Sequence, residues 1–483
     1  MRFIFLIGLI FIGLGLISCG QEKQVAPNIV FILVDDLGWA DLACYGSDFY
    51  ETPNIDALAK QGMRFTSAYA ASPVCSPTRA AIMTGKYPSS VNITDWIPGQ
   101  DPKGRKLLGP QDRNELALEE ITIAELLKNE CYKTFFAGKW HLGDKGFFPE
   151  DQGFDINIGG NHKGSPVSYY SPYHNPQLED GPEGEYLSDR LVDESIKFME
   201  SAKEDPFLLY LSFYNVHTPI QANKKYVEHF RKKAEKLEEI ADSGFRMEHD
   251  GLTKLRQDNF EYASMIAAMD ENVGRLMDKL EELGLDENTL VVFTSDNGGL
   301  STLQNNRKAP TSNEPLRAGK GWCYEGGIRV PLIIKGPGIT PNSTSEEPVI
   351  SIDFYNTISE AVNVSKDKIP ENDGTSLMPL LKGNKSLDRE GLYFHYPHYH
   401  GSAWEPGAAV RKGDYVYIEF YEDEKVELYN IKEDLEETND LSSKMPEKVA
   451  ELKTVLNEFH EKTGAQFPIN NPEFNKEKPK RDH

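Results

Sequence analysis

Cysteine is scarce in this chain of 483 residues, which holds five: Cys19, Cys44, Cys75, Cys131 and Cys323. They lie far apart, whereas a fold that depends on disulfides clusters its cysteines in a short chain. The spacing therefore excludes a disulfide framework, although one structural pair stays open. Each cysteine must instead be judged by its own sequence surroundings.

Positive charge is also in short supply, because 52 Lys and Arg residues stand against 76 Asp and Glu residues, a formal net charge of −24. This imbalance argues against a nucleic-acid partner, since phosphate backbones bind clustered Lys and Arg. Long-range attraction would not bring an anionic substrate to such a protein. If the substrate is an anion, a local basic pocket or a metal ion must hold it.

The chain begins with an apolar run, residues 3–17, that is short for a membrane span and has the length of a signal-peptide core. The following Ser18-Cys19 completes a pattern that resembles a bacterial lipobox. We expect residues 1–18 to be a lipoprotein signal peptide, Cys19 to carry lipid, and residues 19–26 to form a short tether. The alternative is an ordinary signal peptide with a chance cysteine. Either form sends the mature protein out of the cytoplasm. A lipid anchor at Cys19 would hold it at a membrane of the bacterial cell envelope, on the periplasmic side or at the outer-membrane surface.

Three further apolar runs predict buried strands: Asn28–Val34 and residues 207–213 and 290–295. They are continuous and rich in β-branched or large apolar residues, as in strands that a parallel sheet buries on both faces. Each ends in polar residues, and ligand sites of open α/β sheets lie at that edge. Apolar side chains at helical spacing predict a helix over residues 262–283, with Gly284 as its stop. The pattern predicts an α/β fold class, a large mostly parallel sheet flanked by helices.

The sequence changes character near residue 375, and short strand candidates and turns follow. The strand candidates are residues 392–396, 415–418 and 427–430, and a helical pattern follows over residues 446–462. These predict a small antiparallel sheet with a helix. We therefore divide the chain into a catalytic α/β domain, residues 27–380, and a C-terminal α+β subdomain, residues 381–483.

Acidic and amide side chains follow two of the predicted strands. Asp35 and Asp36 come directly after the first, and Asp296 and Asn297 come after the strand at residues 290–295. Together these oxygens would make a site for a hard cation, Ca²⁺ or Mg²⁺. Taken singly, each pair also suits an ordinary turn.

Cys75 lies in the run Cys75-Ser76-Pro77-Thr78-Arg79. Pro77 suits the first turn of a helix, which would place Cys75 at a helix N-terminus, where anions are favoured. Arg79 would lie one turn in and could point back to the same spot. Cys75 is thus a candidate nucleophile, and the alternative is a buried cysteine beside a helix start.

The same run matches the C-x-P-x-R signature of type I sulfatases, and five other motifs of that family occur in the family's order, one before this run and four after it. They are Asp35-Asp36-x-Gly38, Gly138–Gly143, His217-Thr218-Pro219, Thr294–Gly298 and Gly319-Lys320-Gly321. The chain therefore resembles the formylglycine-dependent sulfatases, and among them the bacterial carbohydrate sulfatase lipoproteins. The resemblance implies an alkaline-phosphatase-like fold.

The resemblance also implies a mechanism. A sulfatase-maturating enzyme would convert Cys75 to formylglycine (3-oxoalanine), whose hydrated aldehyde is the nucleophile. One Ca²⁺ ion would be bound by Asp35, Asp36, Asp296, Asn297 and the modified Cys75. The catalytic residues implied are Arg79, Lys139, His141, His217 and Lys320.

Among these, Arg79, Lys139 and Lys320 would hold the sulfate. Asp296 would accept the nucleophile's proton. His217 or Lys320 would protonate the leaving sugar oxygen. His141 would then help to expel sulfate and restore the aldehyde.

The substrate is less well defined by the sequence. His162, Arg317 and His398 are candidate substrate-binding residues, although each also suits a solvated loop. The resemblance implies a sulfated oligosaccharide released during bacterial breakdown of a polysaccharide such as ulvan or an algal galactan, with mucin or glycosaminoglycan fragments as other sources. Two other functions stay open, a phosphodiesterase or phosphonate hydrolase of the same superfamily and an inactive glycan-binding lipoprotein.

Overall fold

The computed structural model describes residues 26–99, 104–238 and 244–475. The predicted signal peptide, the lipid site at Cys19 and the tether up to residue 25 lie outside the described residues. None of the helices found in the described residues has the length and apolar character that a membrane crossing requires.

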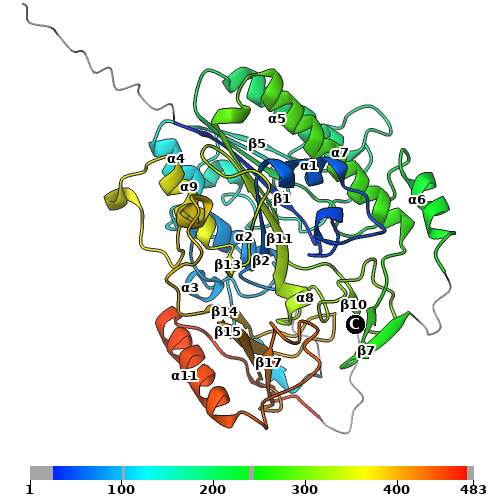
Figure 1. The fold of residues 1–483 in the computed structure, drawn as a ribbon, viewed down its shortest axis with the longest axis vertical. Helices are drawn as coiled ribbons and strands as arrows, with labels where there is room; N and C mark the ends of the chain where they lie inside the picture. The colour runs from blue at the N-terminus through cyan, green and yellow to red at the C-terminus, as the bar shows by residue number, and fades with distance from the viewer. Residues whose placement is uncertain (1–25, 100–103, 239–243, 476–483) are drawn as a thin grey trace, which may run out of the picture.

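A mixed sheet of nine strands forms the centre of the described structure (Figure 1). Eight strands lie in the order β12-β2-β11-β9-β1-β6-β4-β5, and β13 pairs with β2. Their bounds are β1 Asn28–Val34, β2 Met63–Tyr69, β4 Lys133–Gly138, β5 Ile156–Ile158, β6 Phe207–Ser212, β9 Thr289–Ser295, β11 Arg329–Lys335, β12 Ser343–Ser345 and β13 Val349–Ile350. The run from β9 to β5 is parallel, and β11 is antiparallel to both β9 and β2. The predicted mostly parallel sheet is confirmed.

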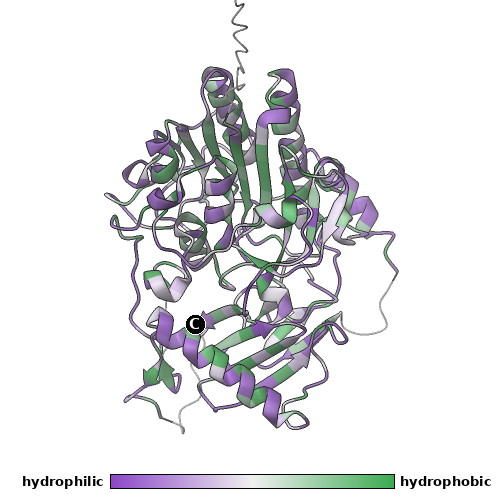
Figure 2. Cartoon of the chain, turned by 60° about the vertical axis from the view of Figure 1, so that its left-hand side comes forward, coloured by the Kyte–Doolittle hydropathy of each residue, from purple (hydrophilic) through white to green (hydrophobic). Residues whose placement is uncertain are grey.

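Helices cover both faces of this sheet. One face carries α1 (Pro53–Gln61), α5 (Leu187–Ala202) and α7 (Phe260–Glu282), and the other carries α2 (Cys75–Thr84), α4 (Ile123–Asn129) and α9 (Asp353–Ala361). Strand β1 serves both cores, because Val30 and Ile32 pack on the first face and Ile29 and Phe31 on the second. Figure 2 shows the resulting pattern, with hydrophobic strands between helices whose outer faces are hydrophilic.

A four-stranded antiparallel sheet and a long helix make up the C-terminal part. The strands are β14 Leu392–Tyr396, β15 Gly407–Lys412, β16 Tyr415–Phe420 and β17 Val426–Asn430, and the helix is α11 Pro446–Thr463. Three of the strands and the helix coincide with the sequence prediction, and β15 was not predicted. A third apolar core joins this sheet to Tyr69, Tyr87 and Trp322 of the larger part.

Short elements connect these layers and shape the loops. The strands are β3 Leu107–Leu108, β7 Phe245–Glu248, β8 Gly251–Lys254, β10 Thr302–Leu303 and β18 Ile469–Asn470. The short helices are α3 Pro88–Val91, α6 Val227–Ala234, α8 Glu325–Ile328 and α10 Met378–Leu381, with 3-10 turns at Ala43–Tyr45, Pro149–Gln152, Asp286–Asn288 and Lys366–Lys368. Strand β10 pairs with β8 and directs the loop after Leu303 toward the residues that follow β14.

Candidate active site

The carboxyl ends of four neighbouring parallel strands bring the polar motifs together. The ends are level, since Val34 of β1 pairs with Ser295 of β9, and Ser212 of β6 pairs with Leu33 of β1 and Gly138 of β4. The residues that follow are Asp35 and Asp36, Asp296 and Asn297, His217, and Lys139 and His141. The structure thus gathers motifs that are far apart in sequence; Asp36 and Asn297, for example, are separated by 261 positions.

Three ion pairs organise this cluster. The Lys139 ammonium donates to both carboxylate oxygens of Asp35 at 2.9 and 2.8 Å. The guanidinium of Arg79, a residue of helix α2, lies 2.7 Å from Asp296 Oδ2. The Lys320 ammonium lies 2.7 Å from Asp36 Oδ1 and 2.9 Å from Oδ2.

The carboxylates are removed from solvent, and this sets their protonation. Burial raises the pKa of Asp35 well above its ordinary value, and Lys139 offsets the rise only in part. Burial is the largest single influence on Asp36 and Asp296 and acts to raise the pKa of each. The neighbouring positive charges together outweigh burial, with Lys320 foremost at Asp36 and Arg79 foremost at Asp296, so that both pKa values fall. Three formal negative charges thus face three formal positive charges, and the charged form of Asp35 is the least stabilised of the three carboxylates.

The arrangement fits a hard divalent cation. The side-chain oxygen of Asn297 is buried and has no hydrogen-bond partner in the described structure, while its amide nitrogen donates to Asp36 Oδ1 at 2.8 Å. Asp35, Asp36 and His217 also present ligand atoms within 4.8 Å of one another. An unpaired amide oxygen beside crowded carboxylates is the donor set that Ca²⁺ and Mg²⁺ prefer.

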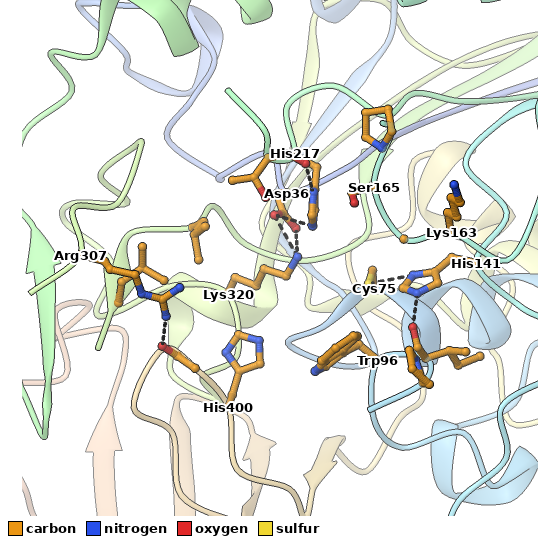
Figure 3. Close-up of a pocket in the computed structure, with 18 of the residues that line it drawn as sticks. Asp36, Cys75, Trp96, His141, Lys163, Ser165, His217, Arg307, Lys320 and His400 are labelled. Atoms are coloured by element: carbon orange, nitrogen blue, oxygen red, sulfur yellow. Dashed lines mark hydrogen bonds and ion pairs between the residues drawn. The ribbon is translucent and has the colours of Figure 1, made fainter. Parts of the chain in front are cut away.

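Cys75 begins helix α2, and its sulfur faces His141 (Figure 3). The Sγ atom lies 3.3 Å from His141 Nδ1, and His141 Nε2 lies 2.5 Å from the carbonyl oxygen of Ile97. Because a carbonyl only accepts, Nε2 carries the proton, and Nδ1 presents its lone pair to the side chains of Cys75 and Ser76, whose Oγ lies 3.1 Å away. Burial, followed by the Lys139 charge, lowers the pKa of His141 well below its ordinary value, so that the ring is a neutral proton acceptor.

His217 and Lys320 flank Asp36 on the other side (Figure 3). His217 Nδ1 donates to the carbonyl of Thr218 at 2.7 Å, and Nε2 lies 3.7 Å from Asp36 Oδ2. Burial and then Lys320 lower the pKa of His217 to about 3. At Lys320, burial opposes the charged form, but the surrounding acidic groups, with Asp36 foremost, together outweigh burial and the pKa rises.

A cavity of about 1240 Å³ opens above these residues. Asp36, Cys75, His141, His217 and Lys320 reach its wall, whereas Arg79 and Lys139 are not among its lining residues. The rest of the wall comes from Trp96–Pro98, Arg105, residues 162–167, Thr218, Leu300, residues 303–304, Arg307 and residues 399–401. The cavity is larger than a single sugar requires and has the volume for an oligosaccharide.

The structure separates the three predicted substrate-binding residues. His162 lines the cavity. Arg317 does not, because its guanidinium pairs with Glu248 at 2.7 Å and lies 3.9 Å above the Tyr324 ring. His398 is 4% exposed, and its Nε2 bonds to Thr94 Oγ1 at 2.8 Å, so it holds a loop and is not part of the cavity wall. The predictions for Arg317 and His398 were wrong, since both side chains are consumed by partners inside the fold.

Arg105 and Arg307 line the cavity, and the sequence analysis did not identify them. Arg105 lies over the ring of Tyr399 at 5.2 Å. Neither arginine belongs to a motif or a periodic pattern, so no local signal separates them from surface arginines.

Comparisons with known proteins agree with this geometry. A sulfatase family model matches residues 27–364, and a model described as N-sulphoglucosamine sulphohydrolase, C-terminal, matches residues 318–462. A sulfatase of Formosa agariphila is 31% identical, over 89% of this chain and 88% of its own. Human arylsulfatase A is 31% identical, over 83% of this chain and 76% of its own. The crystal structure of Ps i-CgsB is 30% identical with a TM-score of 0.72, over 90% of this chain and 92% of that one.

Proposed function

The chain belongs to the sulfatase family, and from this premise we propose that it removes sulfate from an oligosaccharide with a formylglycine made from Cys75 and one Ca²⁺ ion. Its fold is the alkaline-phosphatase-like sulfatase fold, and its class is sulfuric ester hydrolase. One observation carries the proposal: the Cys75 side chain shares a cavity with Lys320, His141, His217 and Asp36.

The cation would be held by Asp35, Asp36, Asp296, Asn297 and the modified Cys75. When bound, it would supply Lewis-acid stabilisation of the sulfate oxygens. A second support is electrostatic. Asp35, Asp36 and Asp296 are matched by Arg79, Lys139 and Lys320, so a divalent cation would leave a net positive site that suits an anionic ester.

Arg79 and Lys139 work from behind the carboxylates in this proposal. Both are nearly without solvent contact and are engaged by Asp296 and Asp35. They fix the orientation of these two carboxylates and limit their repulsion. Lys320 is the cation that reaches the cavity and faces the sulfate, where it offsets charge that develops on the sulfate oxygens.

Proton transfer would divide between two sides of the cavity. His141 holds its lone pair at Nδ1 toward the Cys75 position and accepts a proton there as sulfate leaves. On the side of Asp36, Lys320 Nζ would protonate the oxygen of the leaving sugar. His217 is the alternative donor, but it would first have to take up a proton at Nε2, because its Nδ1–H is engaged by Thr218. Both atoms belong to residues of the cavity wall.

We propose a sulfated galactan fragment as the substrate, and one comparison supports this choice. The structure of Ps i-CgsB in complex with k-i-k-neocarrahexaose is 29% identical, with a TM-score of 0.72. The cavity of about 1240 Å³ has room for such a fragment. Ulvan, mucin and glycosaminoglycan fragments complete the set of polymers worth testing.

The same proposal includes the cellular setting. A sulfatase-maturating enzyme would act on Cys75 before or during export, and lipid on Cys19 would hold the protein in the bacterial cell envelope. Labelling with a lipid precursor, with Cys19→Ala as the matched variant, tests the anchor. Loss of label in that variant is expected, and equal label would rule the anchor out.

The decisive experiment joins mass spectrometry to sulfate release. After co-expression with a maturating enzyme, the Cys75 peptide should be about 18 Da lighter than the unmodified peptide, since oxygen replaces sulfur with loss of two hydrogens. That protein should release sulfate from a panel of sulfated oligosaccharides, and Cys75→Ala should not. Sulfate release by the Cys75→Ala protein would overturn the mechanism. Faster cleavage of an aryl phosphate than of the matched aryl sulfate would favour a phosphodiesterase.

A further inference from the structure

The cavity wall carries more positive than negative side chains, whereas the molecule as a whole is acidic. Asp36 is the one carboxylate among the described residues that line it, and it is already engaged by Lys320. Four cationic side chains share the wall, Arg105, Lys163, Arg307 and Lys320, in a chain whose net charge is −24. Lys320 and the metal-binding cluster suffice to bind one sulfate ester. Arg105, Lys163 and Arg307 therefore have no role in binding that ester.

Arg307 is an exposed member of this group, and its guanidinium is oriented but not paired with a carboxylate of the described chain. Its Nε and Nη2 donate to the carbonyls of Gln304 and Gly401 at 3.3 and 3.4 Å, and within the described chain no carboxylate forms an ion pair with it. Two long bonds to neutral carbonyls orient the guanidinium without neutralising its charge. Arg79 and Arg317 differ in this respect, because carboxylates hold both.

His400 lies between Arg307 and the catalytic centre (Figure 3). Its Nδ1 accepts from the backbone N–H of Ser402 at 3.2 Å, which places the ring proton on Nε2. Gly321, beside Lys320, has a φ of +87° and would place a Cβ 2.1 Å from His400 Nδ1, so the glycine makes room for the ring. The chain thus builds a path of three donors, Lys320, His400 and Arg307, leading away from Cys75.

We propose that Arg307, aided by the Nε2–H of His400, binds a second sulfate ester of the substrate while Lys320 faces the ester that is cleaved. The enzyme then selects oligosaccharides with two sulfate esters over those with one. This inference rests on the proposed function and names its substrate class more closely. A guanidinium presents paired N–H donors that match sulfate oxygens, and a uronate carboxylate shares that charge with a different shape.

The test compares wild type, Arg307→Gln and Lys308→Gln. Lys308 is the neighbouring exposed cation, it changes the net charge equally, and it does not line the cavity. The substrates are galactan and glycosaminoglycan disaccharides in matched pairs with one or two sulfate esters, plus monosulfated disaccharides that carry a uronate. The readouts are kcat/KM for sulfate release, and Kd for each disaccharide measured by calorimetry on the Cys75→Ala protein.

In the series that is hydrolysed, wild type should favour the disulfated member, and Arg307→Gln should lower that preference about tenfold or more, the scale of one charge-assisted hydrogen bond. The loss should appear in KM and Kd, and Lys308→Gln should keep the wild-type preference. An equal preference in wild type and Arg307→Gln would overturn the second-sulfate site. The opposing outcome is that wild type prefers the monosulfated disaccharides that carry a uronate, and that Arg307→Gln loses that preference. This result would identify a carboxylate as the group that Arg307 binds and would overturn the proposal as stated. Failure of mature wild type to release sulfate from any substrate would instead overturn the proposed function.

Discussion

The hydroxyl of Tyr396 donates a 2.9 Å hydrogen bond to the carboxylate of Asp95, so that strand β14 of the C-terminal sheet holds a loop of the larger part. The same carboxylate oxygen accepts the backbone N–H of Trp96 at 2.8 Å. One residue further on, Ile97 bonds to Ser76 through its N–H and to His141 through its carbonyl. The C-terminal sheet therefore fixes the loop that aligns the base beside Cys75.

Tyr396→Phe should lower activity through this loop. The substitution removes one buried hydrogen bond and leaves Asp95 with one donor fewer, at a cost of about 1–2 kcal/mol in unfolding free energy. Because Ile97 also aligns His141, kcat should fall by more than KM changes. Denaturant unfolding and steady-state kinetics measure the two effects. Tyr393→Phe is the control, since Tyr393 is on the same strand and stacks on Phe459. Equal kinetics in the two variants would contradict the coupling.

Calcium should stabilise the protein through Asn297. An ion that binds only the folded state raises unfolding free energy by about 2.7 kcal/mol at a concentration 100 times its Kd. Asn297→Ala removes one oxygen ligand and should weaken the Ca²⁺-dependent rise in Tm, measured by calorimetry with and without a chelator. Asn272→Ala removes a buried amide that bonds to Ser188 and Asp189, and its Ca²⁺ shift should equal that of wild type. A full shift in Asn297→Ala would remove this residue from the metal site.

Acid should destabilise the C-terminal part through His460. Both ring nitrogens of this residue are buried without hydrogen bonds in the described structure, and its ring contacts His395. Burial lowers the pKa of His460 from 6.5 to about 3 and that of His395 from 6.5 to about 4. Below pH 6.5 these two histidines therefore bind protons in the unfolded chain but stay neutral in the folded chain. The free energy of unfolding consequently falls as pH falls from 6.5 toward the folded-state pKa values.

The expected slope is up to about 1.4 kcal/mol per pH unit for each histidine. His460→Leu should reduce the slope of unfolding free energy between pH 6.5 and pH 4, measured by urea unfolding at several pH values. His229→Leu, on the exposed surface of α6, is the comparison variant and should change the slope less than His460→Leu does. If both variants keep the wild-type slope, His460 is not a source of the acid sensitivity.

Particular residues show how far the sequence could predict this structure. The strands β1, β6 and β9 were recognisable because continuous apolar runs follow from burial on both faces, and their ends located Asp35, His217 and Asp296. Strand β15, Gly-Ala-Ala-Val-Arg-Lys, was missed because its small residues carry little strand preference and its place is set by pairing with β14 and β16.

The errors at Arg317 and His398 have another physical cause. Arg317 and Glu248 are 69 positions apart, and His398 and Thr94 are 304 apart. The local sequence around a side chain that pairs with a distant residue does not differ from that around a side chain that faces a substrate. Arg307 shows the reverse case, since only the folded structure reveals that its loop faces a cavity and that no carboxylate of the described chain pairs with it.

The choice between Lys320 and His217 as the proton donor can be made with leaving groups. A sugar hydroxyl must be protonated as it departs, whereas a nitrophenol leaves as a stable anion, so loss of the general acid should lower kcat about 10²–10⁴-fold for a sugar sulfate and far less for nitrophenyl sulfate. Loss of a residue that only binds sulfate should lower both rates alike. Lys320 carries the charge in this structure, whereas the His217 ring is neutral and already donates through Nδ1. We therefore expect Lys320→Ala to show the leaving-group dependence and His217→Ala to lower both rates by a similar factor. The opposite pattern would assign the proton to His217, and equal losses on both substrates in both variants would exclude both residues as the donor.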